Sequence, residues 1–139
     1  MKIFVDANIL VSVLNKEYPL YTYTARIISL ANNSNMEIFT SPVCLAIAFY
    51  FAEKKSGSKQ AKRKIKLVCD HLQIADITGT CVKRAANNPA ILDFEDGLEY
   101  YAAVESKCRH IITEDTKDFH FSDIPVSDSE TFIKRHVLK

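Results

Sequence analysis

The stretch KIFVDANILVSVL, residues 2–14, indicates the fold because its pattern changes at a single residue. Lys2 to Val5 form a short, mostly apolar run, which ends at Asp6. From Asn8 onward the apolar positions recur every three or four residues, as they do along one side of an amphipathic helix. The stretch therefore predicts a buried strand followed at once by a helix, with an aspartate at the junction.

The same alternation continues to the end of the chain. Further strands are expected at 36–40, 72–77, 110–113 and, at a sheet edge because it contains Pro125, 124–126. Helices are expected at about 20–31, 42–55, 59–71, 79–86, 93–106 and 129–137. Such alternation is typical of right-handed βαβ units. We therefore expect a single α/β domain over residues 1–139, a three-layer sandwich in which helices flank a central parallel sheet.

The composition is that of an ordinary globular chain, with 47% apolar and 25% charged residues in 139. No apolar run approaches the roughly 20 residues that span a membrane, and Asp6 and Asn8 interrupt any secretory signal. The four cysteines are scattered without zinc-site spacing, which favours buried thiols in a reducing compartment. These features exclude a disordered chain and a disulfide scaffold, and they predict a cytoplasmic protein without a membrane partner.

Two acidic groups lie where a ligand site is expected. Asp6 follows the first strand, and the carboxyl ends of parallel strands border the ligand crevice; aspartate is also a good helix cap. The segment DFEDGLE, residues 93–99, holds four acids in seven residues, with Asp93 and Asp96 on one helix face and Phe94 and Leu98 expected to point inward. Capping needs one acid, so the others leave a repulsion that a cation would relieve.

A third acidic group follows the strand at 110–113. In HIITEDTKDF, residues 110–119, Asp115 and Asp118 come just after the strand, again at its carboxyl end. Mg²⁺ and Mn²⁺ prefer such hard oxygen ligands, and a bound ion polarises a phosphodiester. The three groups together predict a divalent-metal site that acts on a polyanion.

Positive charge is concentrated in one segment. Residues 54–66 carry seven lysines and arginines and no acid, although the formal net charge of the whole chain is only +1. Basic side chains bind a phosphate backbone without reading its sequence. The segment is therefore either a contact for RNA or a solvated helix face, and the candidates for RNA contact are Lys54, Lys55, Lys59, Lys62, Arg63 and Lys64.

FVDAN (residues 4–8), DFEDGLEYYAA (93–103) and HIITEDTKDF (110–119), taken in order, resemble a PIN domain, and specifically the VapC-like toxins of type II toxin–antitoxin pairs. The resemblance covers nearly the whole chain. It implies the strand order 3-2-1-4-5 and a Mg²⁺- or Mn²⁺-dependent endoribonuclease that hydrolyses RNA. Asp6 and Asp96 match the first and third metal-site acids of the family. The fourth is Asp115 or Asp118, and the supporting residues are Asn8, Asp93, Glu95 and Thr113.

The resemblance also implies partners. A homodimer is expected, as is capture by an antitoxin whose tail lies across the active site. Tyr18, Tyr21 and Tyr23 form an aromatic cluster that suits either interface, or a loop packed on itself.

Two departures from the family pattern leave the activity open. Many PIN domains carry a glutamate in the helix after the second strand, but here no acid occurs in that helix before Glu53, and Glu95 is the candidate substitute. Ala7 stands where threonine is common. The leading hypothesis is a ribonuclease toxin; the second is a degenerate PIN domain that binds RNA or a protein partner without cleavage. A receiver-like or phosphatase domain is disfavoured, because the first strand ends in Asp6 alone rather than in a pair of acids.

Overall fold

The computed structural model describes residues 1–137 and has a five-stranded sheet at its centre. The strands are β1 (Lys2–Val5), β2 (Glu37–Thr40), β3 (Gln73–Ile74), β4 (His110–Ile112) and β5 (Val126–Ser127). Every neighbouring pair is parallel, and the order is β3-β2-β1-β4-β5. The expected order is confirmed. It differs from the receiver order 2-1-3-4-5.

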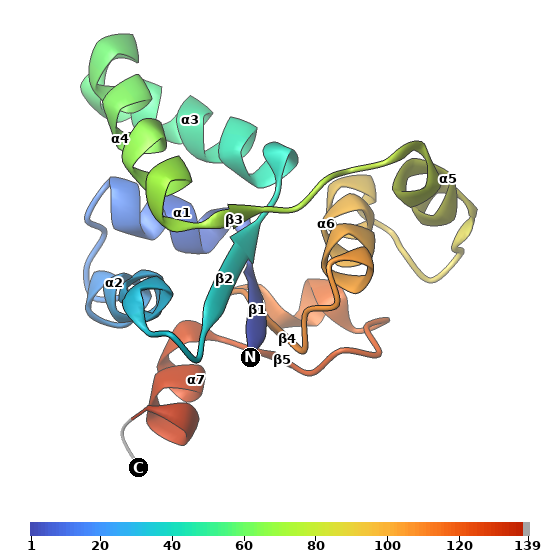
Figure 1. Cartoon of the computed structure of the whole chain (residues 1–139). Helices are drawn as coiled ribbons and strands as arrows, with labels where there is room; N and C mark the ends of the chain where they lie inside the picture. Colours follow the sequence, from blue (N-terminus) through green and yellow to red (C-terminus); the bar gives the residue numbers. More distant parts are fainter. Residues whose placement is uncertain (138–139) are drawn as a thin grey trace.

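Helices lie on both sides of the sheet, so the expected three-layer architecture is confirmed. In Figure 1, α1 and α2 flank the strands on one side and α5 and α6 on the other, while the α3–α4 hairpin extends from the top. The helices are α1 (Ala7–Leu14), α2 (Tyr21–Ser29), α3 (Pro42–Ser56), α4 (Ser58–His71), α5 (Gly79–Asn87), α6 (Phe94–Glu105) and α7 (Ser129–His136), with short 3₁₀ turns at Leu30–Asn32 and Thr116–Phe119.

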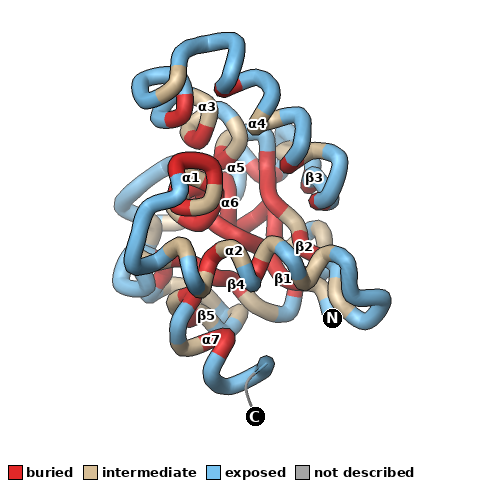
Figure 2. Tube along the Cα trace, turned by 90° about the vertical axis from the view of Figure 1, so that its left-hand side faces the viewer, coloured by how far each residue is buried: buried red, intermediate tan, exposed pale blue. Residues whose placement is uncertain are grey.

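The middle of the sheet forms the core. β1 pairs with β2 on one side and β4 on the other, and Phe4 lies in register with Phe39 and Ile111. Ile3 and Phe4 are fully buried, as an apolar strand covered on both faces should be. Figure 2 shows buried positions through the strands and α6, with the outer turns exposed. Within residues 1–137, no helix is long and apolar enough to cross a membrane.

Two edge strands differ from the expectation. Leu72 is the C-cap of α4, so the strand cannot begin before Gln73. Its last hydrogen bond to β2 is from Ala75 N–H to the Thr40 carbonyl. The strand expected at 72–77 is therefore reduced to two residues. At the other edge, Pro125 accepts a hydrogen bond from Ile111 N–H but has no N–H to donate. The regular pairing therefore begins one residue later, at Val126.

The α3–α4 hairpin has clear local causes. Pro42 occupies the first turn of α3, and the Ser41 hydroxyl accepts a hydrogen bond from Cys44 N–H. Gly57 separates the two helices with a φ of 82°, a conformation that other residues rarely adopt. The helix expected at the C-terminus ends at His136, and the last two residues of the expected domain, 138 and 139, lie outside the described part.

Candidate metal centre

Asp6 lies at the junction of β1 and α1 and is 7% exposed. Its N–H donates to the Ile112 carbonyl, which ties it to the end of β4. One carboxylate oxygen accepts from Ala7 N–H at 2.6 Å, and the other accepts from the Thr113 hydroxyl at 2.7 Å. Asp6 therefore caps α1 and also turns a carboxylate toward the carboxyl end of the sheet, so both interpretations of the sequence apply.

Asn8 holds the segment after β4 against the start of α1. Its amide nitrogen donates to the Thr113 hydroxyl oxygen and to an Asp115 carboxylate oxygen, both at 3.2 Å. Its carbonyl oxygen accepts from Glu114 N–H, also at 3.2 Å. Because Asn8 satisfies three groups at once, it fixes Thr113 and Asp115 relative to Asp6.

The acids of α6 take different positions. Asp93 caps the helix by accepting from Glu95 N–H at 2.9 Å. Asp96 is 8% exposed, and its Oδ2 has no hydrogen-bond partner in the described structure. Burial, together with the charges of Asp93, Asp6 and Asp118, raises the pKa of Asp96 from 3.8 to about 7. Leu98 points inward as expected, but the same expectation for Phe94 is wrong: it lies in the exposed first turn and is 47% exposed.

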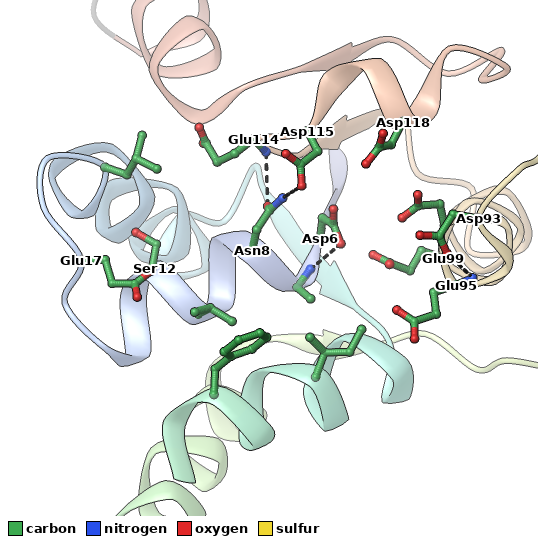
Figure 3. A pocket seen from close by; sticks show the side chains of 16 residues that line it. Asp6, Asn8, Ser12, Glu17, Asp93, Glu95, Glu99, Glu114, Asp115 and Asp118 are labelled. Atoms are coloured by element: carbon green, nitrogen blue, oxygen red, sulfur yellow. Dashed lines mark hydrogen bonds between the residues drawn. The ribbon is translucent and has the colours of Figure 1, made fainter. Parts of the chain in front are cut away.

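These side chains surround one cavity of about 420 Å³, which Figure 3 shows from close by. Asp6 lies at the centre of that view, with Asp93, Glu95 and Glu99 from α6 on one side and Asp115 and Asp118 above. Among residues 1–137, the charged residues of the lining are all acidic, with no lysine or arginine to balance them: Asp6, Glu17, Asp93, Glu95, Asp96, Glu99, Glu114, Asp115 and Asp118.

The structure brings the four proposed metal-site acids into this cavity together with Asn8, Asp93 and Glu95. Thr113 contacts Asp6 directly from the end of β4. Asp115 is held by Asn8, whereas Asp118 lies near enough to Asp96 to raise its pKa and also lines a second small cavity beside it.

Sequence reasoning missed the most buried acid of the site. Glu99, at 2% exposure, accepts a hydrogen bond from the Cys44 thiol of α3 at 3.0 Å. Ligand atoms of Asp6, Cys44 and Glu99 all lie within 4.8 Å of one another. Burial and the neighbouring Cys44 and Asp6 raise the pKa of Glu99 well above its usual value, and burial raises that of the Cys44 thiol to about 11. The available signal was the three-residue spacing from Asp96, which places both acids on one face of α6.

The basic segment lies elsewhere. None of the six candidate RNA contacts lines the acidic cavity; they occupy the end of α3 and the first half of α4, at the far tip of the hairpin in Figure 1. Three of them have contacts within the chain. Lys54 lies over the Tyr50 ring, Lys55 donates to the Asn15 carbonyl, and Lys64 donates to the Ser56 hydroxyl.

The donor set fits a hard divalent cation. The cavity offers carboxylate oxygens from three segments, and one buried oxygen of Asp96 has no other partner. A buried carboxylate is stable only when it is protonated, paired or bound to a metal. No cation from the described chain pairs with it, since the two ion pairs of residues 1–137, Lys66–Asp70 and Lys134–Glu130, lie outside the cavity.

A comparison with protein families agrees with this arrangement: the PIN-domain family model matches residues 2–117. The chain belongs to the PIN-domain family. Membership displaces the receiver-like or phosphatase hypothesis. This PIN domain is 28% identical over 138 residues to Ribonuclease VapC1 of Aquifex aeolicus (strain VF5), a match that covers 96% of this chain and 94% of that protein.

Solved structures share the fold. A chain in the structure of VapBC2 from Rickettsia felis, bound to a DNA fragment from their promoter, superposes with a TM-score of 0.71 at 21% identity, over 92% of this chain and 98% of that chain. Mycobacterium tuberculosis VapC20, described as a sarcin-ricin loop cleaving toxin, gives a TM-score of 0.63 at 13% identity, over 78% and 86% of the two chains. These likenesses support the PIN fold of this chain.

Proposed function

We propose that this PIN domain is a Mg²⁺- or Mn²⁺-dependent endoribonuclease and the toxin of a toxin–antitoxin pair. The observation that carries the proposal is the acidic cavity at the carboxyl end of β1 and β4, where the buried Oδ2 of Asp96 has no partner in the described chain. The similarity to a protein named as a ribonuclease adds the substrate class. We further propose that residues 1–139 act as a single cytoplasmic domain.

The proposed ligands are Asp6, Asp96, Asp115 and Asp118. A divalent ion held there would act as a Lewis acid toward the phosphodiester and would offset part of the cavity's negative charge. The chain's own residues hold the ligands in place. Thr113 and Ala7 N–H orient the two oxygens of Asp6, and Asn8 fixes Asp115.

The basic hairpin tip is the proposed contact for the RNA backbone. Lys59, Lys62 and Arg63 are exposed there, and they lie away from the acidic cavity. A polyanion that occupies the cavity would reach them only if it continued along α3. Their part in binding is therefore electrostatic and independent of sequence.

Two protein partners follow from the same proposal. An acidic cavity that residues 1–137 line without a lysine or arginine suits the basic tail of an antitoxin, which would also block RNA. We propose a homodimer through the aromatic cluster. Tyr18 is 72% exposed with its ring centre 5.3 Å from that of Tyr21, whereas the Tyr23 hydroxyl is already bonded to Glu130.

Cleavage of a mixed RNA pool by the purified protein tests the function. We expect cleavage with Mn²⁺, none with EDTA, and none from the Asp6→Asn variant with Mn²⁺. If wild-type protein that binds Mn²⁺ calorimetrically leaves the RNA intact, the chain is a degenerate PIN domain. The observation that favours that second function is that α3 lines the cavity with Ile47 and Phe51 rather than with an acid.

A further inference from the structure

The helix α3 leaves one side of the acidic cavity without an acid. Its two residues in the lining are Ile47 and Phe51. A divalent ion held only by Asp6, Asp96 and the segment after β4 would therefore face an apolar wall on this side. A further carboxylate has to reach that side from another element if the ion is to be held from there.

Glu99 is the acid that the fold places there. It lies one turn after Asp96 on the same face of α6 and is 2% exposed, less than any other acid in the cavity lining. Its carboxylate contacts the first turn of α3 through Cys44, whose thiol donates to it at 3.0 Å. Glu99 thus crosses the cavity from α6 to the N-terminus of α3, where the helix dipole favours negative charge.

Three neighbouring contacts place Glu99 and Cys44. The Ser41 hydroxyl caps α3 by accepting from Cys44 N–H, and it donates to the Cys44 sulfur, both at 3.2 Å. The thiol in turn donates to one oxygen of Glu99. Ligand atoms of Asp6 and Glu99 lie within 4.8 Å of each other, a separation that one ion can bridge.

A second observation shows that this cluster lacks a cation. Asp96 is more than nine-tenths buried, lines the same cavity, and has an oxygen without a hydrogen-bond partner in the described structure. Asp96 and Glu99 point to the same side of α6, and both line the cavity together with Asp6. A set of buried acids that served only packing would be expected to have its oxygens paired within the chain.

We propose that Glu99 is a ligand of the divalent ion and replaces, from α6, the acid that α3 does not supply, with Cys44 as its positioning residue. The inference rests on the proposed metal-dependent function. It changes the expected ligand set, because Glu95, which the sequence suggested as the substitute, lines the cavity but is exposed, whereas Glu99 is buried. Glu99 accounts for activity without an acid on α3.

Calorimetric titration of the full-length protein with Mn²⁺ at pH 7.5 tests the proposal. Glu99→Gln should weaken Mn²⁺ binding at least about tenfold, since even residues that only support ligands change metal affinity by that much. Glu53→Gln is the matched control: it makes the same change on an exposed residue of α3 outside the cavity, and its affinity should equal that of the wild type. In the Glu99→Gln background, Ile47→Glu should recover most of the lost affinity, because it returns a carboxylate to the α3 wall.

Thermal unfolding separates a ligand from a structural acid. In EDTA, Glu99→Gln should melt at the wild-type temperature or above it, because the amide has the same shape and its oxygen can still accept the hydrogen bond from Cys44. Its Mn²⁺-induced rise in melting temperature should be much smaller than that of the wild type. Should Glu99→Gln fail to fold, Glu99→Asp keeps the charge but withdraws the oxygens by one methylene, and it should lose affinity in the same assay.

The outcomes are distinguishable from those of the proposed function. Equal Mn²⁺ affinity in Glu99→Gln and wild type, or a lower melting temperature in EDTA with an unchanged Mn²⁺-induced rise, overturns the role of Glu99 alone. Mn²⁺ binding that depends on Glu99 in a protein that cleaves no RNA supports the ligand and overturns the nuclease. A wild-type protein that binds no Mn²⁺ overturns both.

Discussion

Asp96 should make the metal-free protein less stable as the pH rises. A carboxylate in an ion pair has the opposite effect, because its pKa is lowered in the folded state and it stabilises the protein as the pH rises. The pKa of Asp96 is raised from 3.8 to about 7 in the folded state. Between these two values the native state binds more protons than the unfolded state, so stability is lost as the pH climbs through this window. Above pH 7 the folded protein holds a buried, charged and unpartnered carboxylate.

The size of the effect follows from the two pKa values. The difference between 3.8 and about 7 is worth about 4 kcal/mol at about 1.4 kcal/mol per pH unit. Asp96 lines an open cavity, so solvent screening reduces this by about half, to ~2 kcal/mol. The Asp96→Asn variant, which cannot ionise, should therefore be more stable than the wild type by about 2 kcal/mol at pH 7.5 and by only about 0.5 kcal/mol at pH 4.5.

Urea unfolding in EDTA at several pH values between 4.5 and 7.5 measures this difference directly. Glu53→Gln, which removes an exposed carboxylate from α3, should follow the wild type throughout. Saturating Mn²⁺ at pH 7.5 should reverse the order, since the wild type gains about 2.7 kcal/mol at a hundredfold excess over Kd and the variant gains little. A variant that is less stable than the wild type by the same amount at every pH would refute the reasoning and make Asp96 a structural acid.

Three further predictions concern the surroundings of the site. Burial and its charged neighbours lower the pKa of His110 from 6.5 to about 4. The free energy of unfolding of the wild type should therefore fall by about 1.5 kcal/mol as the pH drops from 6.5 to 4, and urea titrations of His110→Gln should lack this pH dependence. Thr113→Val removes the hydroxyl that donates to Asp6, so it should lower the free energy of unfolding in EDTA by about 1–3 kcal/mol and weaken Mn²⁺ binding. Thr113→Ser keeps the hydroxyl and should keep the wild-type stability and Mn²⁺ affinity. Gly97→Ala should lower the melting temperature, because the new Cβ would lie 3.0 Å from the Cβ of Ala85. Overpacking typically destabilises a folded protein by about 1–3 kcal/mol, which is more than the ~1 kcal/mol that alanine gains over glycine in helix propensity.

The central part of the fold was predictable from local pattern. β1 is a short apolar run that ends in an aspartate, and in a parallel sheet this places Asp6 at the ligand edge whatever lies around it. The helix caps are equally local: Ser41 before Pro42 and Asp93 before Phe94 both cap as their sequences indicate. Such signals need only the neighbouring residues, so no tertiary information is required to read them.

The rest of the site depends on contacts between elements. Cys44 was read from sequence as a small buried hydrophobe, and it is buried, but its contact with Glu99 joins residues 55 positions apart. Phe94 was expected inward because it is apolar, yet as the first residue of α6 it is 47% exposed. The strand at Gln73 is short because α4 runs to His71 and β2 ends at Thr40, and neither boundary is contained in the sequence of the strand itself.

The proposed ligand set takes two acids from α6 and none from α3. A helix brings residues three apart to the same face, so Asp96 and Glu99 reach the cavity together while Asp93, one turn earlier, is used as the cap. The buried Glu99 carboxylate accepts a hydrogen bond from the Cys44 thiol in the first turn of α3. The α3 side of the cavity wall consists instead of Ile47 and Phe51, which are apolar. Asp96 and Glu99 both come from residues 93–99 at the start of α6, and α3 contributes the Cys44 thiol that contacts Glu99.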